Sequence, residues 1–131
     1  SASILKVIAT LPKNRFRMLP SMRFSHFSEL MRNAAAMIGN SSAGVREAPF
    51  LGIPSLDVGT RQTNRAQADS ICHVTAFDRG AIDTFLSQDW NKRYDRHNAF
   101  GEGSAAERFG AVLQAPSFWA ANLQKAFKDS E

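Results

Sequence analysis

The sequence predicts an α/β fold in which a parallel sheet is covered by helices on both faces. Three features of the 131-residue chain support this prediction. Short apolar stretches typical of buried strands recur along it, stretches with the apolar spacing of helices separate them, and Gly or Pro residues mark the turns. Strands that alternate with helices at this spacing are typical of parallel sheets with helices on both sides.

The first part of the chain predicts a strand and a helix. Residues 4–11 fit either the end of a helix or a strand, and a turn signal follows them. Residues 16–19 alternate apolar and polar side chains before a proline, which predicts a short strand. Residues 26–31 place three apolar side chains at i, i+3 and i+4, so we expect a helix there with Ser25 as its N-cap.

The middle of the chain predicts three strands, each followed by a helix. We expect the strands at residues 35–38, 53–58 and 71–74 and the helices at 43–51, 64–70 and 81–86. The strand at 35–38 is short and wholly apolar, which is typical of a strand buried on both faces. Gly39 ends this strand, and Gly52 forms the turn that leads into the next one.

The last part of the chain predicts a tight turn and two helices. Residues 101–104 read Gly-Glu-Gly-Ser, in which the glycines suit the turn and Ser104 suits the cap of a helix at 105–113. A further helix is expected at 118–127, with Ser117 as its N-cap after a proline.

The composition is that of one globular domain spanning residues 1–131. Hydrophobic residues make up 44% of the chain and charged residues 21%. No apolar run approaches the roughly twenty residues of a membrane-spanning helix, and the N-terminus lacks the features of a signal peptide. We therefore expect a cytoplasmic protein with no membrane partner. The single cysteine, Cys72, excludes an internal disulfide and lies in an apolar run typical of the core.

The charge pattern limits the possible partners. A formal net charge of +4 indicates an anionic partner without identifying it. The sixteen Lys and Arg residues are scattered and have no stacking aromatic residues among them, so we expect no nucleic-acid partner. The three histidines are scattered too, and none of them resembles part of a catalytic or metal-binding pair. We assign them no role, and we expect neither a metal nor a cofactor.

Residues 38–54 form the most informative segment. A buried strand ends at Gly39, small hydroxyl and glycine residues follow, and a helix begins. In open α/β sheets, such a turn at the carboxyl edge is where ligands bind. Ser41 and Ser42 offer hydroxyl donors, and the first helical turn offers free N–H groups and the positive end of the helix dipole. Gly44 leaves room for an anion to approach the backbone.

The acidic residue in the predicted helix completes this hypothesis. Glu47 lies about one turn into the helix, where its carboxylate can accept two hydrogen bonds from a ribose diol. The alternative is purely structural: Ser41 or Ser42 caps the helix and Glu47 complements its dipole. Spacing alone does not separate the two interpretations.

Three linked motifs resemble those of the hydrolysing UDP-N-acetylglucosamine 2-epimerases. They read GNSSAGVREAP at 39–49, LGIP at 51–54 and GTRQTNR at 59–65. The non-hydrolysing epimerases tend to carry an Asp-Ser-Gly-Gly run, so the Asn-Ser-Ser run of this chain fits the hydrolysing pattern better. Residues 15–24 and 100–104 fit the same family in order and spacing, so the resemblance covers almost the whole chain.

This resemblance implies a Rossmann-like domain that forms the C-terminal half of a GT-B fold. Ser41 and Ser42 are then expected to donate hydrogen bonds to the diphosphate of UDP, and Glu47 is expected to hold the ribose hydroxyls. Arg61 is expected to supply positive charge near the nucleotide, although a solvated surface arginine stays an alternative. The segment that ends at Phe24 is expected to frame the uracil.

The resemblance also implies a reaction for the full-length protein. Family members remove the proton at C2 of the sugar and expel UDP to give a glycal, and water then adds with inverted stereochemistry at C2 and releases N-acetylmannosamine. The acid and base groups come mainly from the N-terminal domain, which this chain is expected to lack. We therefore assign no catalytic residue and expect the chain alone to be inactive. The full-length form is expected to be a homo-oligomer.

Two other interpretations stay open at this point. A GT-B glycosyltransferase binds its donor with the same fold and a similar phosphate turn, and a non-catalytic module can sense a nucleotide sugar without chemistry. The sugar is open as well, because N-acetylglucosamine and a 2,4-diacetamido relative both fit.

Overall fold

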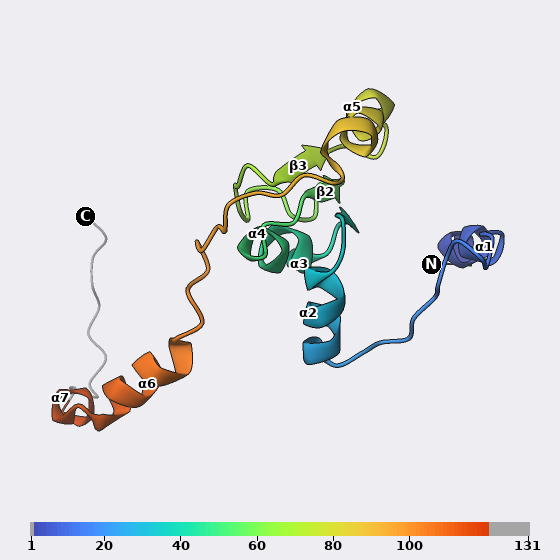
Figure 1. Cartoon of the computed structure of the whole chain (residues 1–131). Coiled ribbons are helices and arrows are strands. Elements are labelled where there is room, and N and C mark those ends of the chain that lie inside the picture. The colour runs from blue at the N-terminus through green and yellow to red at the C-terminus, as the bar shows by residue number, and fades with distance from the viewer. Residues whose placement is uncertain (1, 121–131) are drawn as a thin grey trace.

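The computed structural model describes residues 2–120 (Figure 1). The described elements, in chain order, are α1 (Ala2–Ala9), α2 (Phe24–Arg32), β1 (Met37–Gly39), α3 (Ser42–Val45), α4 (Glu47–Phe50), β2 (Ser55–Val58), β3 (Ile71–Val74), α5 (Arg79–Thr84), the π-helical turn η1 (Phe85–Asp89), α6 (Ala105–Gln114) and α7 (Pro116–Trp119).

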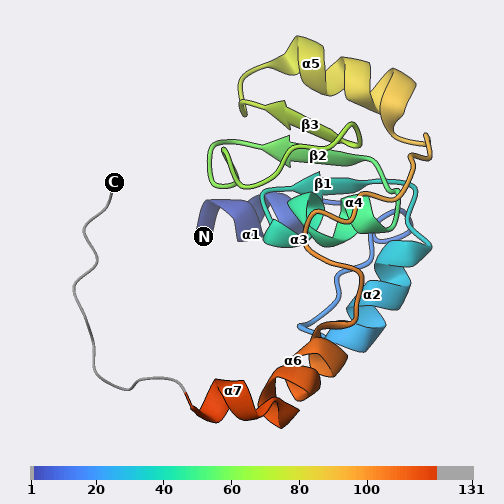
Figure 2. The same ribbon diagram turned by 90° about the vertical axis from the view of Figure 1, so that its left-hand side faces the viewer.

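The strands form one parallel sheet in the order β1-β2-β3. Figure 2 shows the three strands running in the same direction, with α3 and α4 between β1 and β2 and an irregular loop between β2 and β3. Leu56 of the central strand lies opposite Ile38 on one side and Cys72 on the other. The predicted α/β class with a parallel sheet is therefore confirmed.

Helices cover both faces of this sheet. Leu56 points to one face, where it packs with Val74 and with Phe85 of η1. Ser55, its neighbour along β2, points to the opposite face and lies against Gly44 of α3. Figure 1 views the sheet nearly along its strands and shows α3 and α4 on one side and α5 on the other. The predicted two-sided cover is confirmed.

A second apolar cluster joins α2 to the loop that precedes β2. Met31 of α2, Ala48 of α4 and Ile53 are buried together, and Phe27, Met37 and Leu51 pack against them. This cluster packs α4 against α2 and β1. The turn after β1 is thereby held at the carboxyl edge of the sheet.

Gly52 forms the predicted turn before β2, and its backbone explains why glycine is needed. Its φ of +67° lies in the left-handed region, and a Cβ there would overlap the backbone carbonyl oxygen of Tyr94. Tyr94 and His97 donate backbone hydrogen bonds of 3.1 Å to the carbonyls of Gly52 and Pro49, respectively. The segment after η1 therefore passes close to this turn.

Several predicted elements in the first part of the chain differ from the structure. Residues 4–11 adopt the helical alternative in α1, whereas residues 16–19 form no strand. Met18 is 69% exposed, so an alternating pattern here does not reflect a half-buried sheet face. The predicted N-cap Ser25 is wrong, because α2 begins at Phe24 with Arg23 at the N-cap and no side-chain cap bond.

The elements around the sheet also need corrections. β1 is not buried on both faces, because it is an edge strand of the described sheet and Ile38 is 55% exposed. The single helix predicted at 43–51 is divided at Arg46, whose φ of −113° departs from helical values. The helix predicted at 64–70 is wrong. Those residues form turns and irregular chain, and Asn64 has a φ of +60°.

The late helices follow the prediction more closely. The helix predicted at 81–86 is present as α5 and η1, and α6 matches the helix predicted at 105–113. Ser104 occupies the N-cap of α6 but makes no side-chain cap bond. Ser117 is not an N-cap, because α7 begins at Pro116 with Ala115 in that place. Most of the helix predicted at 118–127 lies outside the described residues.

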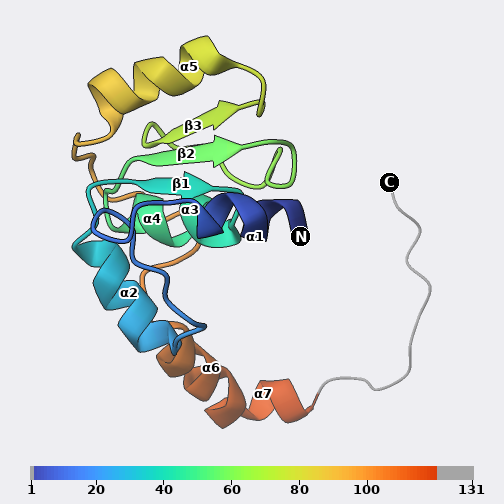
Figure 3. The same cartoon turned by 90° about the vertical axis from the view of Figure 1, so that its right-hand side faces the viewer.

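Helices α6 and α7 extend away from the sheet (Figure 3), and α1 lies apart from it in Figure 1. None of their residues is buried within the described part of the chain. Large apolar side chains of these helices are exposed, namely Ile4, Leu5, Val7, Phe109, Val112, Phe118 and Trp119. None of the helices in residues 2–120 combines the length and apolar character needed to cross a membrane.

Candidate functional site

The turn after β1 presents two exposed serines at the carboxyl edge of the sheet. Ser41 lies at the N-cap of α3, and its Oγ accepts a hydrogen bond of 3.3 Å from the backbone N–H of Ala43. Ser42 is the first residue of α3 and is exposed as well. Ser41 therefore caps the helix, as the structural interpretation predicted, while its exposure leaves the same oxygen accessible to a ligand.

The helix behind this turn is shorter than the sequence predicted. α3 spans four residues, so its dipole is smaller than that of a helix over 43–51. An anion at this turn would be held mainly by the serine hydroxyls and the first N–H groups, with little help from a long helix.

Gly44 lies on the side of α3 that faces the sheet. It is buried, and a Cβ at this position would lie 2.7 Å from Oγ of Ser55 on β2. The missing side chain therefore allows α3 to approach β2 closely. The structure places this predicted ligand residue in the packing between helix and sheet, away from the exposed side of the turn.

Glu47 is the first residue of α4 and is half-buried. Its Oε2 atom is buried and has no hydrogen-bond partner among the described residues. An unpartnered buried oxygen of this kind is costly, about 1–3 kcal/mol in folded proteins, unless a ligand or water completes it. Glu47 therefore carries an unpaired carboxylate oxygen shortly after the serine turn, and its binding of a ribose stays a prediction.

The loop after β2 is fastened to the serine turn by a residue to which sequence reasoning gave no role. Gln62 is 1% exposed, and its Nε2 donates a hydrogen bond of 2.8 Å to the backbone carbonyl of Asn40. Nη1 of Arg65 donates a bond of 3.4 Å to Oε1 of the same amide. Arg61 precedes Gln62 in this loop and is exposed, so its guanidinium is accessible to a ligand at the turn.

A second contact brings a distant motif to the same region. The guanidinium carbon of Arg46, which separates α3 from α4, lies 4.9 Å from the ring centroid of Phe100. The turn that contains Gly101 and Gly103 follows directly, and both glycines have positive φ, as the tight-turn prediction requires. The motifs at 39–49, 59–65 and 100–104 therefore meet in space.

Phe24 lies elsewhere. It is the first residue of α2 and is 66% exposed. Figures 1 and 2 show α2 extending away from the sheet, with its first turn at the far end. The structure does not bring Phe24 beside the serine turn, because α2 points its beginning away from the carboxyl edge.

The structure reveals a polar pair that the sequence analysis missed. Asp57 of β2 is 2% exposed, and its Oδ2 lies 2.8 Å from Nδ1 of His73, the residue directly opposite on β3. The other carboxylate oxygen, Oδ1, is buried without a partner among the described residues. The two residues are sixteen positions apart in the sequence. Only the register of β2 against β3 aligns them, so their spacing in the sequence could not predict the contact.

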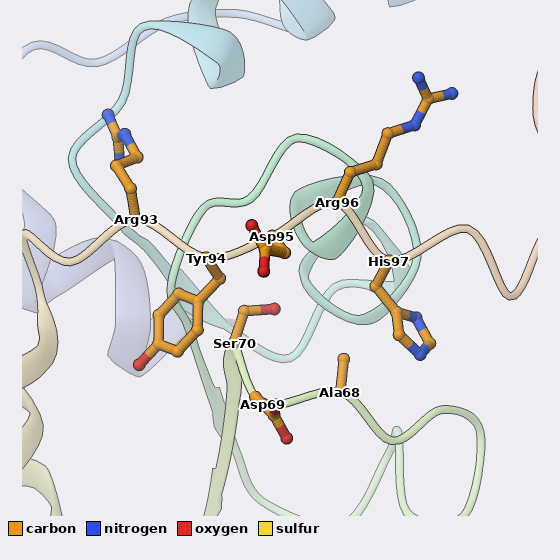
Figure 4. Close-up of a pocket in the computed structure, with 8 residues that line it drawn as sticks. All are labelled: Ala68, Asp69, Ser70, Arg93, Tyr94, Asp95, Arg96 and His97. Carbon is orange, nitrogen blue, oxygen red and sulfur yellow. The ribbon is translucent and has the colours of Figure 1, made fainter.

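A cavity of about 380 Å³ lies at the opposite, amino edge of the sheet (Figure 4). Ser70, which precedes β3, and Asp95 point into it. Arg93 and Arg96 point away, because Arg93 donates to the carbonyls of Ala34 and Ala35 and Arg96 stacks on the ring of Phe50. This cavity is separate from the serine turn, so it does not correspond to the predicted nucleotide site.

Cys72 has the features of a core residue. It packs against the cluster of Leu56, Val74 and Phe85, as its apolar run predicted. Burial raises the pKa of its thiol, and the carboxylates of Asp89 and Asp78 raise it further. The thiolate that a nucleophile needs is therefore disfavoured. Within residues 2–120, no group of three or more His, Cys, Asp or Glu side chains is arranged to hold a metal ion.

Comparison with known proteins identifies the family. A family model described as UDP-N-acetylglucosamine 2-epimerase matches residues 1–114. Over 130 residues the chain is 38% identical to a UDP-N-acetylglucosamine 2-epimerase of Neisseria meningitidis serogroup B, with 97% of this chain and 34% of the relative covered. Over 100 residues it is 32% identical to a UDP-N,N'-diacetylbacillosamine 2-epimerase (hydrolyzing) of Legionella pneumophila, with 75% of this chain and 26% of that relative covered.

The chain thus spans about a third of the length of the first relative and about a quarter of the second. The family match extends over all three motifs that meet in space, from the serine turn to the turn at 100–104. The family match and the similarity to the Neisseria enzyme show, in agreement with the parallel sheet, that the chain belongs to the UDP-N-acetylglucosamine 2-epimerase family.

Proposed function

We propose that this chain is the UDP-binding part of a hydrolysing UDP-N-acetylglucosamine 2-epimerase and forms one domain. The single observation that carries the proposal is the pair of exposed serines at the carboxyl edge of the sheet, in a chain that belongs to this family. Ser41 and Ser42 donate to the diphosphate, and the first N–H groups of α3 assist them. Exposed Arg61 adds a charge-assisted bond from the neighbouring loop.

The ribose completes the site. Glu47 follows the serine turn, and its buried Oε2 lacks a partner among the described residues. A ribose diol supplies two hydroxyl donors to the carboxylate of this half-buried residue. A diphosphate at Ser42 and a ribose at Glu47 are neighbours in UDP, as these residues are neighbours in the fold.

The full-length protein then eliminates UDP from the nucleotide sugar and hydrates the resulting glycal at C2. The hydrolysing assignment is supported by the Asn-Ser-Ser run at 40–42 and by relatives whose names include that activity, from Legionella pneumophila and Campylobacter jejuni. The acid and base groups belong to parts of the protein beyond these 131 residues. We propose that the protein acts in the cytoplasm as a homo-oligomer.

Titration calorimetry on the 131-residue chain tests the nucleotide site. We expect tighter binding of UDP than of uridine, because the serine turn binds the phosphates and uridine has none. Ser42→Ala removes one donor without removing the cap bond of Ser41, so it is expected to lower the preference for UDP. Ser117→Ala, at an exposed position of α7, is the matched control. Equal affinities for UDP and uridine in the unmodified chain would contradict the proposal.

A further inference from the structure

The strongest feature without an assigned role is the pair formed by Asp57 and His73. A distance of 2.8 Å joins Oδ2 of the buried Asp57 to Nδ1 of His73, whose side chain is 39% exposed. This contact engages Nδ1 of the imidazole. The ring is held in one orientation, and Nε2 is the nitrogen that remains for another partner.

His73 is also one of the residues that line a cavity. This cavity has a volume of about 240 Å³ and is lined by Thr63, Asn64, Ala66, Gln67 and His73. Apart from the imidazole, its polar groups are one hydroxyl and two amides, which are neutral and both donate and accept. Groups of this kind match the hydroxyls and the N-acyl group of a sugar. A bare anion would instead require positive charge in the lining.

The size of the cavity indicates one part of a larger ligand. Pockets that enclose whole ligands have volumes of about 300–1,000 Å³, so this smaller space suits a single ring. Apart from His73 of β3, its lining residues belong to the loop that Gln62 fastens to Asn40 at the serine turn. The loop that is bonded to the serine turn therefore also forms most of this cavity.

We propose that this cavity holds the sugar ring of the nucleotide sugar and that His73, oriented by Asp57, binds a polar group of that ring through Nε2. The proposal rests on the proposed function, because it takes the diphosphate at the serine turn as its starting point. His73 is a binding residue in this account, and Asp57 is a positioning residue that acts through it.

Two substitutions of His73 separate binding from structure. The amide of His73→Asn reaches the position of Nδ1 and keeps a partner for Asp57, whereas the longer His73→Gln places its amide near the position of Nε2. We expect His73→Asn to lower the affinity for UDP-N-acetylglucosamine about tenfold, the effect of one lost hydrogen bond. His73→Gln is expected to retain more of that affinity. Neither variant is expected to change the affinity for UDP.

The control is His26→Asn, the same substitution at an exposed position of α2. Circular dichroism and thermal unfolding of each variant show whether it is folded before it is titrated. A second measurement on the unmodified chain avoids substitution altogether. The ¹⁵N resonance of Nε2 of His73 is expected to shift when UDP-N-acetylglucosamine is added and to shift much less with UDP.

The outcomes distinguish this inference from the proposed function. If the unmodified chain binds UDP and His73→Asn binds UDP-N-acetylglucosamine as tightly as the unmodified chain, the sugar assignment is overturned while the nucleotide site stands. If His73→Asn loses UDP and UDP-N-acetylglucosamine equally, His73 does not act on the sugar, and the inference is overturned as well. If the unmodified chain binds no UDP at all, the proposed function fails and this inference falls with it.

Discussion

The side-chain amide of Gln62 donates a 2.8 Å hydrogen bond to the backbone carbonyl of Asn40, and so joins the loop after β2 to the turn after β1. Because Gln62 is 1% exposed, water cannot replace this bond without opening the loop. The relative position of the serine turn and the loop with Arg61 therefore depends on one neutral side chain.

Gln62→Ala is expected to destabilise the chain and to weaken ligand binding together. The substitution leaves the carbonyl of Asn40 without its partner and opens a small cavity, at a combined cost of about 1–3 kcal/mol in the free energy of unfolding. Urea denaturation measures this cost, and calorimetry with UDP-N-acetylglucosamine measures the binding. Gln88→Ala, at an exposed position, is the control. Normal stability of Gln62→Ala would show that the loop does not depend on this bond.

Glu47→Ala is expected to weaken the binding of UDP and to leave the binding of inorganic pyrophosphate unchanged. The carboxylate binds the ribose in our proposal, and pyrophosphate has no ribose. Competition titrations with both ligands provide the measurement. Glu107→Ala, at an exposed position of α6, is the matched control. Equal losses for the two ligands would contradict the ribose assignment.

Gly44→Ala is expected to lower the free energy of unfolding by about 1–2 kcal/mol through overpacking. The new Cβ would lie 2.7 Å from Oγ of buried Ser55, but 4.0 Å from Cβ of the same residue. Removing the hydroxyl in Ser55→Ala should therefore make Gly44→Ala neutral or slightly stabilising. A double-mutant cycle measured by thermal unfolding tests this coupling.

Gly110→Ala is the control for the substitution of Gly44. Gly110 lies in α6 with open space around the position of a Cβ, so Gly110→Ala is expected to stabilise the chain by up to about 1 kcal/mol through helix propensity. If Gly44→Ala costs the same with and without the hydroxyl of Ser55, close approach of α3 to β2 is not the reason for glycine at position 44.

Cys72 is expected to react slowly with thiol reagents. Its raised pKa lowers the fraction of thiolate at any given pH, and the thiolate is the reacting species. The rate of reaction with a disulfide reagent at pH 8, compared between the folded chain and the chain in urea, measures the effect. A rate in the folded chain equal to that in urea would contradict it.

The raised pKa of Cys72 also makes the stability of the folded chain depend on pH. Because the pKa is raised in the folded chain, the folded state holds the thiol proton more tightly than the unfolded state does. The stabilisation that results is fully present below the pKa of the unfolded thiol. It is lost as the pH rises through the pKa of the folded thiol.

The sequence was sufficient for the parts of the fold that depend on local pattern. The apolar runs at 53–58 and 71–74 predicted β2 and β3, and the positive φ of Gly52 agrees with its predicted turn. The strand predicted at 16–19 is absent, because an alternating pattern specifies a strand only where a neighbouring strand pairs with it. The helix expected at 64–70 failed because the backbone at Asn64 takes the left-handed conformation.

The candidate site was predictable only where its residues lie close together in the sequence. The serine turn and Glu47 are contiguous in the sequence, so a local motif indicated them together. Asp57 and His73 come together only through the register of β2 against β3, and a pattern along one chain does not contain that register. Gln62 belongs to a recognisable motif, but its role depends on burial, which its neighbours in sequence do not determine.

The outer strand of the sheet has a consequence for how this chain behaves in solution. Among the described residues, β1 has a hydrogen-bonded neighbour on one side only, and Ile38 is 55% exposed on it. The open side presents backbone donors and acceptors that attract any extended segment of matching direction. This strand therefore makes the 131-residue chain prone to pair edge to edge with a second copy of itself at high concentration.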